Sequence, residues 1–233
     1  MSTALDRLQE RIGYSFRDRK FLETAVTHLS YLAEHPEVGE SNQRLEFLGD
    51  AVLQILIAEA LFDLFPKERE GPLSKRRALL VNGSILAHLA REIQLDQCLK
   101  LGASEETTGG RNRTSSLGDA FEALVGAVYL DSDIDRARRV VLELYGPLAD
   151  RLATVEDLEN PKGRLQEFVQ PRHGNHAVRY EVTAVHGEDH AREYEVAVFV
   201  MDRALGTGRG PSKKVAEEVA ARAALAAIRR DEG

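Results

Sequence analysis

A strongly apolar segment that carries two acidic residues most constrains what this chain can fold into. Residues 42–53 place Glu46 and Asp50 four positions apart, so a helix would present both on one face. Half of the ten remaining positions are leucine, valine or phenylalanine. Apolar neighbours imply burial, and an ionised carboxylate removed from water needs a compensating charge or a proton. The segment therefore predicts a buried helix with an acidic site on it.

A second segment repeats this pattern about seventy residues later. Residues 116–130 carry Asp119 and Glu122 three positions apart on an even more apolar predicted helix. The sequence has no lysine or arginine between Arg113 and Arg136 to neutralise them. Two such helices facing each other would bring four carboxylates together.

A cluster made only of carboxylates predicts a metal centre of a particular kind. Hard oxygen ligands suit Mg²⁺ or Mn²⁺, whereas zinc sites favour Cys and His. Such ions activate water for attack on a phosphoryl centre, which indicates phosphodiester hydrolysis. The alternative is that each acidic pair caps or salt-bridges a neighbouring helix, with Arg44 or Arg77 as its partner.

Composition excludes several other classes. The single cysteine, Cys98, has no partner for a disulfide or a metal pair, and no histidine pair has the spacing of a zinc motif. No apolar run is long enough to span a bilayer, and the N-terminus lacks the apolar region of a signal peptide. We therefore expect a soluble, cytoplasmic chain that does not bind membranes.

Charge and periodicity divide the chain into two domains. The net charge of −7 is uneven: residues 1–150 carry −6, residues 151–160 carry −2 and residues 161–233 carry +1. Residues 1–152 show helical periodicity and residues 153–160 have the composition of a short acidic linker. Residues 161–233 alternate like strands between two helices, which predicts an α-β-β-β-α order.

The expected elements around and after the linker can be placed by residue. They are a helix over 134–152, a helix over 162–170 ended by Pro171, strands over 179–185 and 194–200, a short strand near 204–206, and a long helix after Ser212. The glycine-rich stretch 206–214 lacks the third glycine of a dinucleotide fingerprint. With Lys213 and Lys214 at a helix N-terminus, it predicts an anion site instead.

These residues carry a family resemblance. Residues 42–53 resemble the ribonuclease III signature, and residues 117–131 resemble that family's second acidic helix. Further motifs follow in the family's order: Gly13-Tyr14-Ser15-Phe16, Thr27-His28-Leu29-Ser30, Gly71-Pro72-Leu73-Ser74, Arg77-Ala78-Leu79 and Gly109-Gly110-Arg111. The resemblance implies an all-α N-terminal endonuclease domain followed by a small α+β double-stranded RNA-binding domain.

The resemblance also implies roles for the acidic residues. Glu46, Asp119 and Glu122 would bind Mg²⁺, with Mn²⁺ as a substitute, while Asp50 would complete the cluster and help to orient or activate the water. Asp50 and Glu122 are thus the expected catalytic residues. Where the family usually has a second Glu, this chain has Gln43, which supplies neither charge nor a base.

Other expectations from the resemblance concern products and partners. The enzyme would cut double-stranded RNA as a homodimer, leave 5′-phosphates and short 3′ overhangs, process ribosomal RNA precursors and other RNAs, and need no small-molecule cofactor. Phe47 stands at the family position that inserts into the partner subunit; the alternative is ordinary core packing.

The expected RNA contacts lie in the second domain. Gln166 and Glu167 would touch one minor groove and residues 187–190, including His190, the next, while Lys213 and Lys214 would meet phosphates between them. Two other functions stay open: a protein that binds double-stranded RNA without cutting it, which Gln43 favours, and a monomeric hydrolase of free nucleotides.

Overall fold

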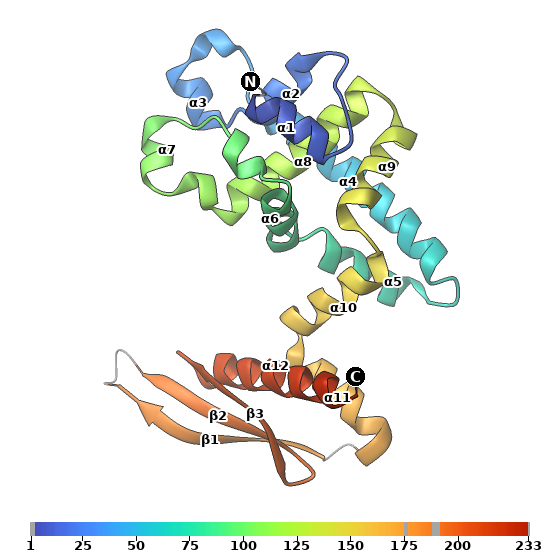
Figure 1. Cartoon of the computed structure of the whole chain (residues 1–233), viewed down its shortest axis with the longest axis vertical. Helices are drawn as coiled ribbons and strands as arrows, with labels where there is room; N and C mark the ends of the chain where they lie inside the picture. Colours follow the sequence, from blue (N-terminus) through green and yellow to red (C-terminus); the bar gives the residue numbers. More distant parts are fainter. Residues whose placement is uncertain (1–2, 175–176, 188–191, 233) are drawn as a thin grey trace. The chain divides into compact units, whose positions relative to one another are not determined.

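The computed structural model describes residues 3–174, 177–187 and 192–232, which fall into two compact units (Figure 1). The first unit is Met1–Leu152 and contains only helices and their connections, while the second is Ala153–Gly233 and contains the sheet. The structure thus has the fold class that the sequence predicted, a helical unit followed by an α+β unit.

The first unit is built around two long helices, α4 (Gln43–Leu64) and α8 (Thr114–Asp131). Ten shorter helical elements surround or follow them along the chain: α1 (Ala4–Arg11), α2 (Arg19–Ala25), α3 (Leu29–Glu34), η1 (Pro36–Val38), α5 (Glu70–Leu80), α6 (Gly83–Glu92), η2 (Leu95–Cys98), α7 (Ala103–Thr107), η3 (Gly110–Asn112) and α9 (Ile134–Tyr145). Both long helices are apolar on most sides because they form the core of this unit.

Two glycines let the long helices approach with their backbones in contact. A Cβ added to Gly49 of α4 would lie 1.8 Å from the carbonyl oxygen of Glu122 on α8. A Cβ added to Gly126 of α8 would lie 2.4 Å from the carbonyl oxygen of Leu45 on α4. Any larger residue at either position would push the helices apart, so these glycines set the crossing distance.

A buried carboxylate attaches the N-terminal segment to the end of α8. Asp131 accepts hydrogen bonds from the Tyr14 hydroxyl at 2.6 Å and from the backbone N–H groups of Arg17 and Asp18, both at 2.8 Å. Burial raises the pKa of Asp131, but these hydrogen bonds outweigh it and leave the pKa below its usual value.

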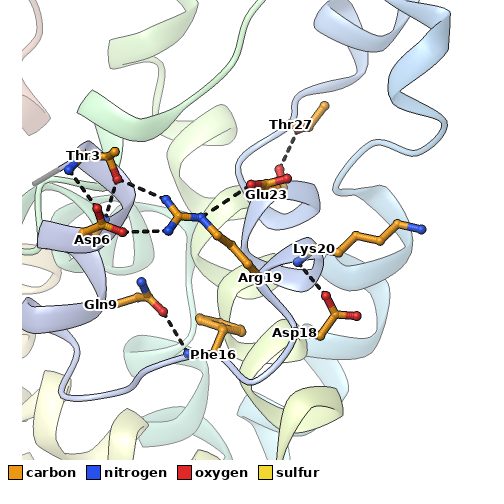
Figure 2. Close-up of polar contacts among 9 residues, drawn as sticks. All are labelled: Thr3, Asp6, Gln9, Phe16, Asp18, Arg19, Lys20, Glu23 and Thr27. Carbon is orange, nitrogen blue, oxygen red and sulfur yellow. Dashed lines mark hydrogen bonds and ion pairs between the residues drawn. The ribbon is translucent and has the colours of Figure 1, made fainter.

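The helices α1 and α2 are joined by an arginine (Figure 2). The Arg19 guanidinium donates to Asp6 at 2.8 Å and to the Thr3 hydroxyl at 3.1 Å, and it lies 3.6 Å from the Glu23 carboxylate. Thr3 and Asp6 also form the capping box that begins α1. The contacts are exposed, so their contribution to stability is small, but they fix how α1 begins beside α2.

One predicted helix is in fact two. The expected helix over 134–152 is interrupted between α9 and α10 (Leu148–Glu159). Gly146 has φ of 65°, a left-handed value that ends α9, and Pro147 follows it. The prediction of one continuous helix was wrong because apolar periodicity continued across a Gly-Pro break. The predicted linker, residues 153–160, is helical as far as Glu159.

The second unit packs two helices with a three-stranded antiparallel sheet. Its elements are α11 (Pro161–His173), β1 (Val178–His186), β2 (Glu193–Val200), β3 (Arg203–Gly210) and α12 (Lys213–Glu232), with strand order β1-β2-β3. The core is formed by two residues of α11, alternate residues of β2 and the mostly alanine face of α12: Leu165, Val169, Val196, Val198, Val200, Ala216, Ala220, Ala221, Ala224 and Leu225. This is the predicted α-β-β-β-α order.

Two boundaries in this unit differ from the prediction. Pro171 lies inside α11, which ends only at Gly174 with φ of 81°; a proline in the last turn is tolerated where few hydrogen bonds are lost. β3 continues to Gly210, beyond the short strand that was expected near 204–206. A Cβ on Gly208 would lie 2.3 Å from the Ala216 carbonyl oxygen, so glycine here lets α12 lie against the strand.

Within the part of the chain that the structure describes, no helix is both long enough and apolar enough to cross a lipid bilayer.

Candidate metal centre and RNA-binding residues

Three of the four predicted acids converge where α4 and α8 cross. Glu46 comes from α4, and Asp119 and Glu122 come from α8. One carboxylate oxygen from each lies within 4.8 Å of the other two, and all three side chains are partly buried. The glycine contact at Gly49 lies one turn along from Glu46 and directly against Glu122, so the close helix crossing is what brings the acids together.

The cluster holds concentrated negative charge at neutral pH. Burial, together with the charges of Asp50, Glu46 and Asp119, raises the pKa of Glu122 to about 7. Burial and the charges of Asp119 and Asp50 raise the pKa of Glu46. Burial also raises the pKa of Asp119, although nearby His28 opposes it. Either a proton or a cation must therefore relieve the repulsion.

Arginine does not neutralise the cluster. Arg44, one of the two alternative partners, instead pairs with Glu40 at 3.0 Å. In the described ranges, none of the three converging carboxylates forms an ion pair with lysine or arginine. Among the described residues, the salt-bridge alternative therefore finds no support for these three acids.

Asp50 lies beside the group of three. The Gln54 side-chain amide, one turn further along α4, donates to both of its carboxylate oxygens, at 2.9 Å and 3.1 Å. Asp50 is not among the residues whose ligand atoms lie within 4.8 Å of one another. Its charge nevertheless contributes to the raised pKa values of Glu46 and Glu122. The expected cluster of four is thus three converging acids and one flanking acid.

The donor atoms fit a hard divalent cation. Three carboxylates from two helices offer oxygen ligands, and no lysine or arginine among the described residues offsets the repulsion between them. Mg²⁺ and Mn²⁺ prefer such oxygen ligands, and either ion would offset this repulsion. Magnesium usually takes only one or two carboxylates plus water or substrate oxygens, and the partial exposure of these side chains leaves room for such ligands. The residues present therefore fit the metal that the sequence predicted.

Gln43 and Phe47 both face outward at the start of α4. Gln43 is exposed, and Phe47 is 82% exposed. Both line a cavity of about 770 Å³, together with Leu130 at the end of α8. A phenylalanine this exposed does not pack in the core of its own chain, so ordinary core packing is excluded for Phe47.

The predicted RNA contacts are exposed wherever the structure describes them. Gln166 and Glu167 lie on the exposed side of α11, and Lys213 and Lys214 form the first turn of α12. Just before that turn, the Ser212 hydroxyl accepts a hydrogen bond from the Val215 N–H at 3.3 Å, as expected for a helix cap. His190 lies outside the described residues.

Two arginines in the loop before α8 are paired within the chain. Arg111 donates to Glu106, with Nε at 2.8 Å, and to the backbone oxygen of Asp96 at 2.6 Å. Arg113 forms an ion pair with Glu105. Both side chains hold the loop that leads into α8.

Sequence reasoning missed Gln54 and the two crossing glycines. Gln54 had a signal, since it stands four residues after Asp50 on the same helix. Gly49 and Gly126 gave only a weak sequence signal. A glycine inside a helix often marks a close contact with another helix, but the sequence does not show which helix that is.

Comparison with known proteins agrees with both units. A family model described as "Ribonuclease-III-like" matches residues 18–148, and one described as "Double-stranded RNA binding motif" matches residues 161–228. A protein named Ribonuclease 3 from Pseudomonas aeruginosa is 47% identical over 229 residues, covering 98% of this chain and 97% of that protein. The Ribonuclease 3 of Pseudomonas entomophila is 45% identical over 230 residues, with the same coverage.

Solved structures match the first unit. One is the nuclease domain of ribonuclease III from Campylobacter jejuni, in a study of a flexible region involved in dimer formation; it is 38% identical, has a TM-score of 0.57, and covers 60% of this chain and 94% of that chain. A second structure of that domain is 35% identical with a TM-score of 0.57, covering 68% and 97%. Sequence and fold together place this chain in the ribonuclease III family.

Proposed function

We propose that this chain is a divalent-metal-dependent endoribonuclease that hydrolyses phosphodiester bonds in double-stranded RNA. The observation that carries the proposal is the convergence of Glu46, Asp119 and Glu122, without a neutralising arginine or lysine among the described residues. The proposal is supported by the family of the first unit and by the RNA-binding motif matched in the second.

In this proposal Glu46, Asp119 and Glu122 are the metal ligands. A bound Mg²⁺, with Mn²⁺ as a substitute, would supply a polarised water and stabilise the charge that develops on the phosphate oxygens. Before the ion binds, Glu122 holds a proton for part of the time near pH 7, because its pKa is raised to about 7.

Asp50 and Glu122 are the proposed catalytic residues. The Gln54 amide occupies one lone pair on each Asp50 oxygen, which leaves the others to accept a hydrogen bond from water. Asp50 thus completes the acidic site by orienting the attacking water rather than by joining the group of three. The exposed Gln43 takes no catalytic role.

The second unit supplies affinity for the duplex. Gln166 and Glu167 on α11, and His190, would contact minor grooves, while Lys213 and Lys214 at the α12 N-terminus would contact phosphates. Contacts of this kind recognise A-form shape with little sequence preference. The near-neutral charge of residues 161–233 does not oppose this, because a few placed lysines carry the electrostatic part.

The proposed working unit is a homodimer with one centre for each strand. Phe47 is 82% exposed and lies beside a cavity of about 770 Å³ on the same face. In a dimer with a two-fold axis, Phe47 of each copy would insert into the cavity of the other copy. Two centres acting on opposite strands would leave 5′-phosphates and short 3′ overhangs. Ribosomal RNA precursors and other structured transcripts are the proposed substrates.

The decisive experiment separates cutting from binding. A long RNA duplex is incubated with the full-length protein in Mg²⁺, in Mn²⁺ and in a chelator, and the products are resolved on denaturing and native gels. We expect cleavage with either metal and none with the chelator. A duplex that stays intact but is retarded on the native gel in all three conditions would establish the non-cleaving binding protein instead.

A further inference from the structure

A second polar cavity lies at the C-terminal end of α8, away from the acidic cluster. Its volume is about 450 Å³, and it lies between the turn that follows α1 and the first turns of α9. The polar side chains that matter on its walls are Ser15, Arg17, Ser132, Asp133, Arg136 and Arg139. Three guanidinium groups therefore face one small cavity.

The cavity arginines have no carboxylate partner of their own. Among the described residues, Arg17, Arg136 and Arg139 form no ion pair within 4.0 Å, whereas Arg138 between them pairs with Glu59 at 2.9 Å and also with Asp135. The charge of the cavity arginines thus remains available to a ligand.

Backbone contacts hold two of these arginines in place without neutralising them. Arg136 donates to the carbonyl oxygen of Gly13 at 3.3 Å, and its guanidinium lies 5.6 Å from the centre of the Tyr14 ring. Arg139 donates through Nε to the carbonyl oxygen of Asp135 at 3.5 Å. Partly ordered side chains lose less conformational entropy on binding.

Two of the nearby carboxylates are already occupied by hydrogen bonds. Asp133 caps α9 by accepting the N–H of Arg136 at 2.8 Å. Asp131 accepts the Tyr14 hydroxyl and the N–H groups of Arg17 and Asp18, and Arg17 offsets part of its charge. A third acid, Glu143, lies beside Gly13, 3.6 Å from a Cβ added to that residue, but among the described residues it forms no ion pair within 4.0 Å with the three arginines.

We propose that this cavity is a binding site for a phosphate group, separate from the metal centre. Arginine is suited to phosphate because its planar fork donates two parallel hydrogen bonds, and the Ser15 hydroxyl adds a further donor. Nine residues of α8 separate Glu122 from Asp131, about 14 Å at the α-helical rise. A ligand in the cavity therefore does not need the acidic cluster, and the proposal stands whether or not the chain cuts RNA.

A phosphate group has two sources in this setting: a backbone phosphate of duplex RNA, or a free phosphorylated small molecule. The experiment uses the full chain in a chelator, so that phosphate cannot bind through a metal ion. Inorganic phosphate and pyrophosphate are titrated by calorimetry against sodium chloride of equal ionic strength, and a short RNA duplex is titrated by fluorescence anisotropy.

Arg139→Gln and Arg138→Gln make a matched pair of variants. Both remove one charge from α9, but only Arg139 lines the cavity, and its exposure makes the substitution tolerable to the fold. Arg139→Lys keeps the charge and removes the fork. Unfolding midpoints of all three are compared with that of the parent, so that a folding defect is not counted as lost binding.

We expect Arg139→Gln to weaken binding of the relevant probe by about tenfold, Arg139→Lys to weaken it less, and Arg138→Gln to leave it unchanged. Weaker binding of phosphate or pyrophosphate by Arg139→Gln would identify a free phosphorylated molecule as the ligand. Weaker binding of the duplex would identify a phosphate of the RNA backbone as the ligand. The proposal would be overturned if Arg139→Gln and Arg138→Gln lost equal affinity for a probe. It would also be overturned if Arg139→Gln bound every probe as tightly as the parent.

Discussion

Replacing Gly49 by alanine tests whether the glycine crossing holds the candidate metal centre. The added Cβ would lie 1.8 Å from the Glu122 carbonyl oxygen, whereas real Cβ contacts are essentially never shorter than 3.0 Å. The helices must therefore separate locally by at least about 1.2 Å. Glu46 moves with α4 and Glu122 stays on α8, so the separation acts directly on the distance between ligands.

The expected losses follow from that displacement. Metal sites require ligand distances within about 0.2 Å of ideal, so a shift of this size removes Glu46 or Glu122 from the shell. We expect Mn²⁺ affinity to fall by at least about 10- to 100-fold and cleavage of duplex RNA by about 100-fold. Overpacking should lower the free energy of unfolding by about 1–3 kcal/mol, partly offset by the better helix propensity of alanine.

The assay combines two measurements on the full-length protein. Free Mn²⁺ is followed by electron paramagnetic resonance during titration, and urea unfolding is followed by circular dichroism. Gly71→Ala is the matched control, because Gly71 is also helical but nothing lies within 4 Å of its added Cβ. Gly126→Ala should be intermediate, since its Cβ contact of 2.4 Å is less severe. Parental Mn²⁺ affinity and cleavage in Gly49→Ala would refute the reasoning.

Four further predictions concern other residues. Glu122→Gln should abolish cleavage while duplex affinity stays within about twofold of the parent in anisotropy titrations, since the proposed RNA contacts lie in the second unit; parental cleavage would contradict the metal assignment. Lys213→Ala combined with Lys214→Ala should weaken duplex binding and reduce the slope of log K against log salt by about 2, and an unchanged slope would exclude phosphate contacts there. Phe47→Asp should give monomers in multi-angle light scattering, and persistent dimers would exclude the proposed contact. Asp131→Asn should lower the free energy of unfolding by about 1–3 kcal/mol at pH 7. The pKa of Asp131 in the folded chain lies below its unfolded value, so the ionised carboxylate stabilises the fold above about pH 4 and this stabilisation is lost as the pH falls further. Urea unfolding should therefore show that the difference in the free energy of unfolding between Asp131→Asn and the parent shrinks below about pH 4. A difference that stays constant with pH would contradict the assignment.

The convergence of Glu46, Asp119 and Glu122 could be predicted from sequence because it depends on features that spacing encodes. Acids at i, i+3 or i, i+4 share a helix face, and two apolar helices with unneutralised acids have few ways to bury themselves other than against each other. The direction of the Asp50 side chain could not be predicted in the same way. It depends on the rotamers of Asp50 and Gln54 together, which the spacing of four residues allows but does not require.

The errors in the fold came from residues whose effect depends on tertiary contacts. Pro171 was expected to end α11, yet it is accommodated in the last turn, where Gly174 provides the left-handed residue that closes the helix. A strand was expected only near 204–206, yet β3 extends to Gly210, and Gly206 and Gly208 lie directly under α12, where a side chain would collide with its backbone. For β3, packing against a neighbouring helix thus decides the structure of the glycine-rich sequence.

The crossing glycines and the acids have opposite effects on the distance between α4 and α8. Three carboxylates within 4.8 Å repel one another, so the acids alone would drive α4 and α8 apart. The apolar core on both helices supplies the opposing attraction, and Gly49 and Gly126 allow that attraction to close the gap down to backbone contact. The raised pKa of Glu122 reflects its burial first and then this repulsion, because folding holds the acids closer than their charges favour. A divalent cation that relieves the repulsion must therefore also stabilise the crossing, which links metal binding to the stability of the whole helical unit.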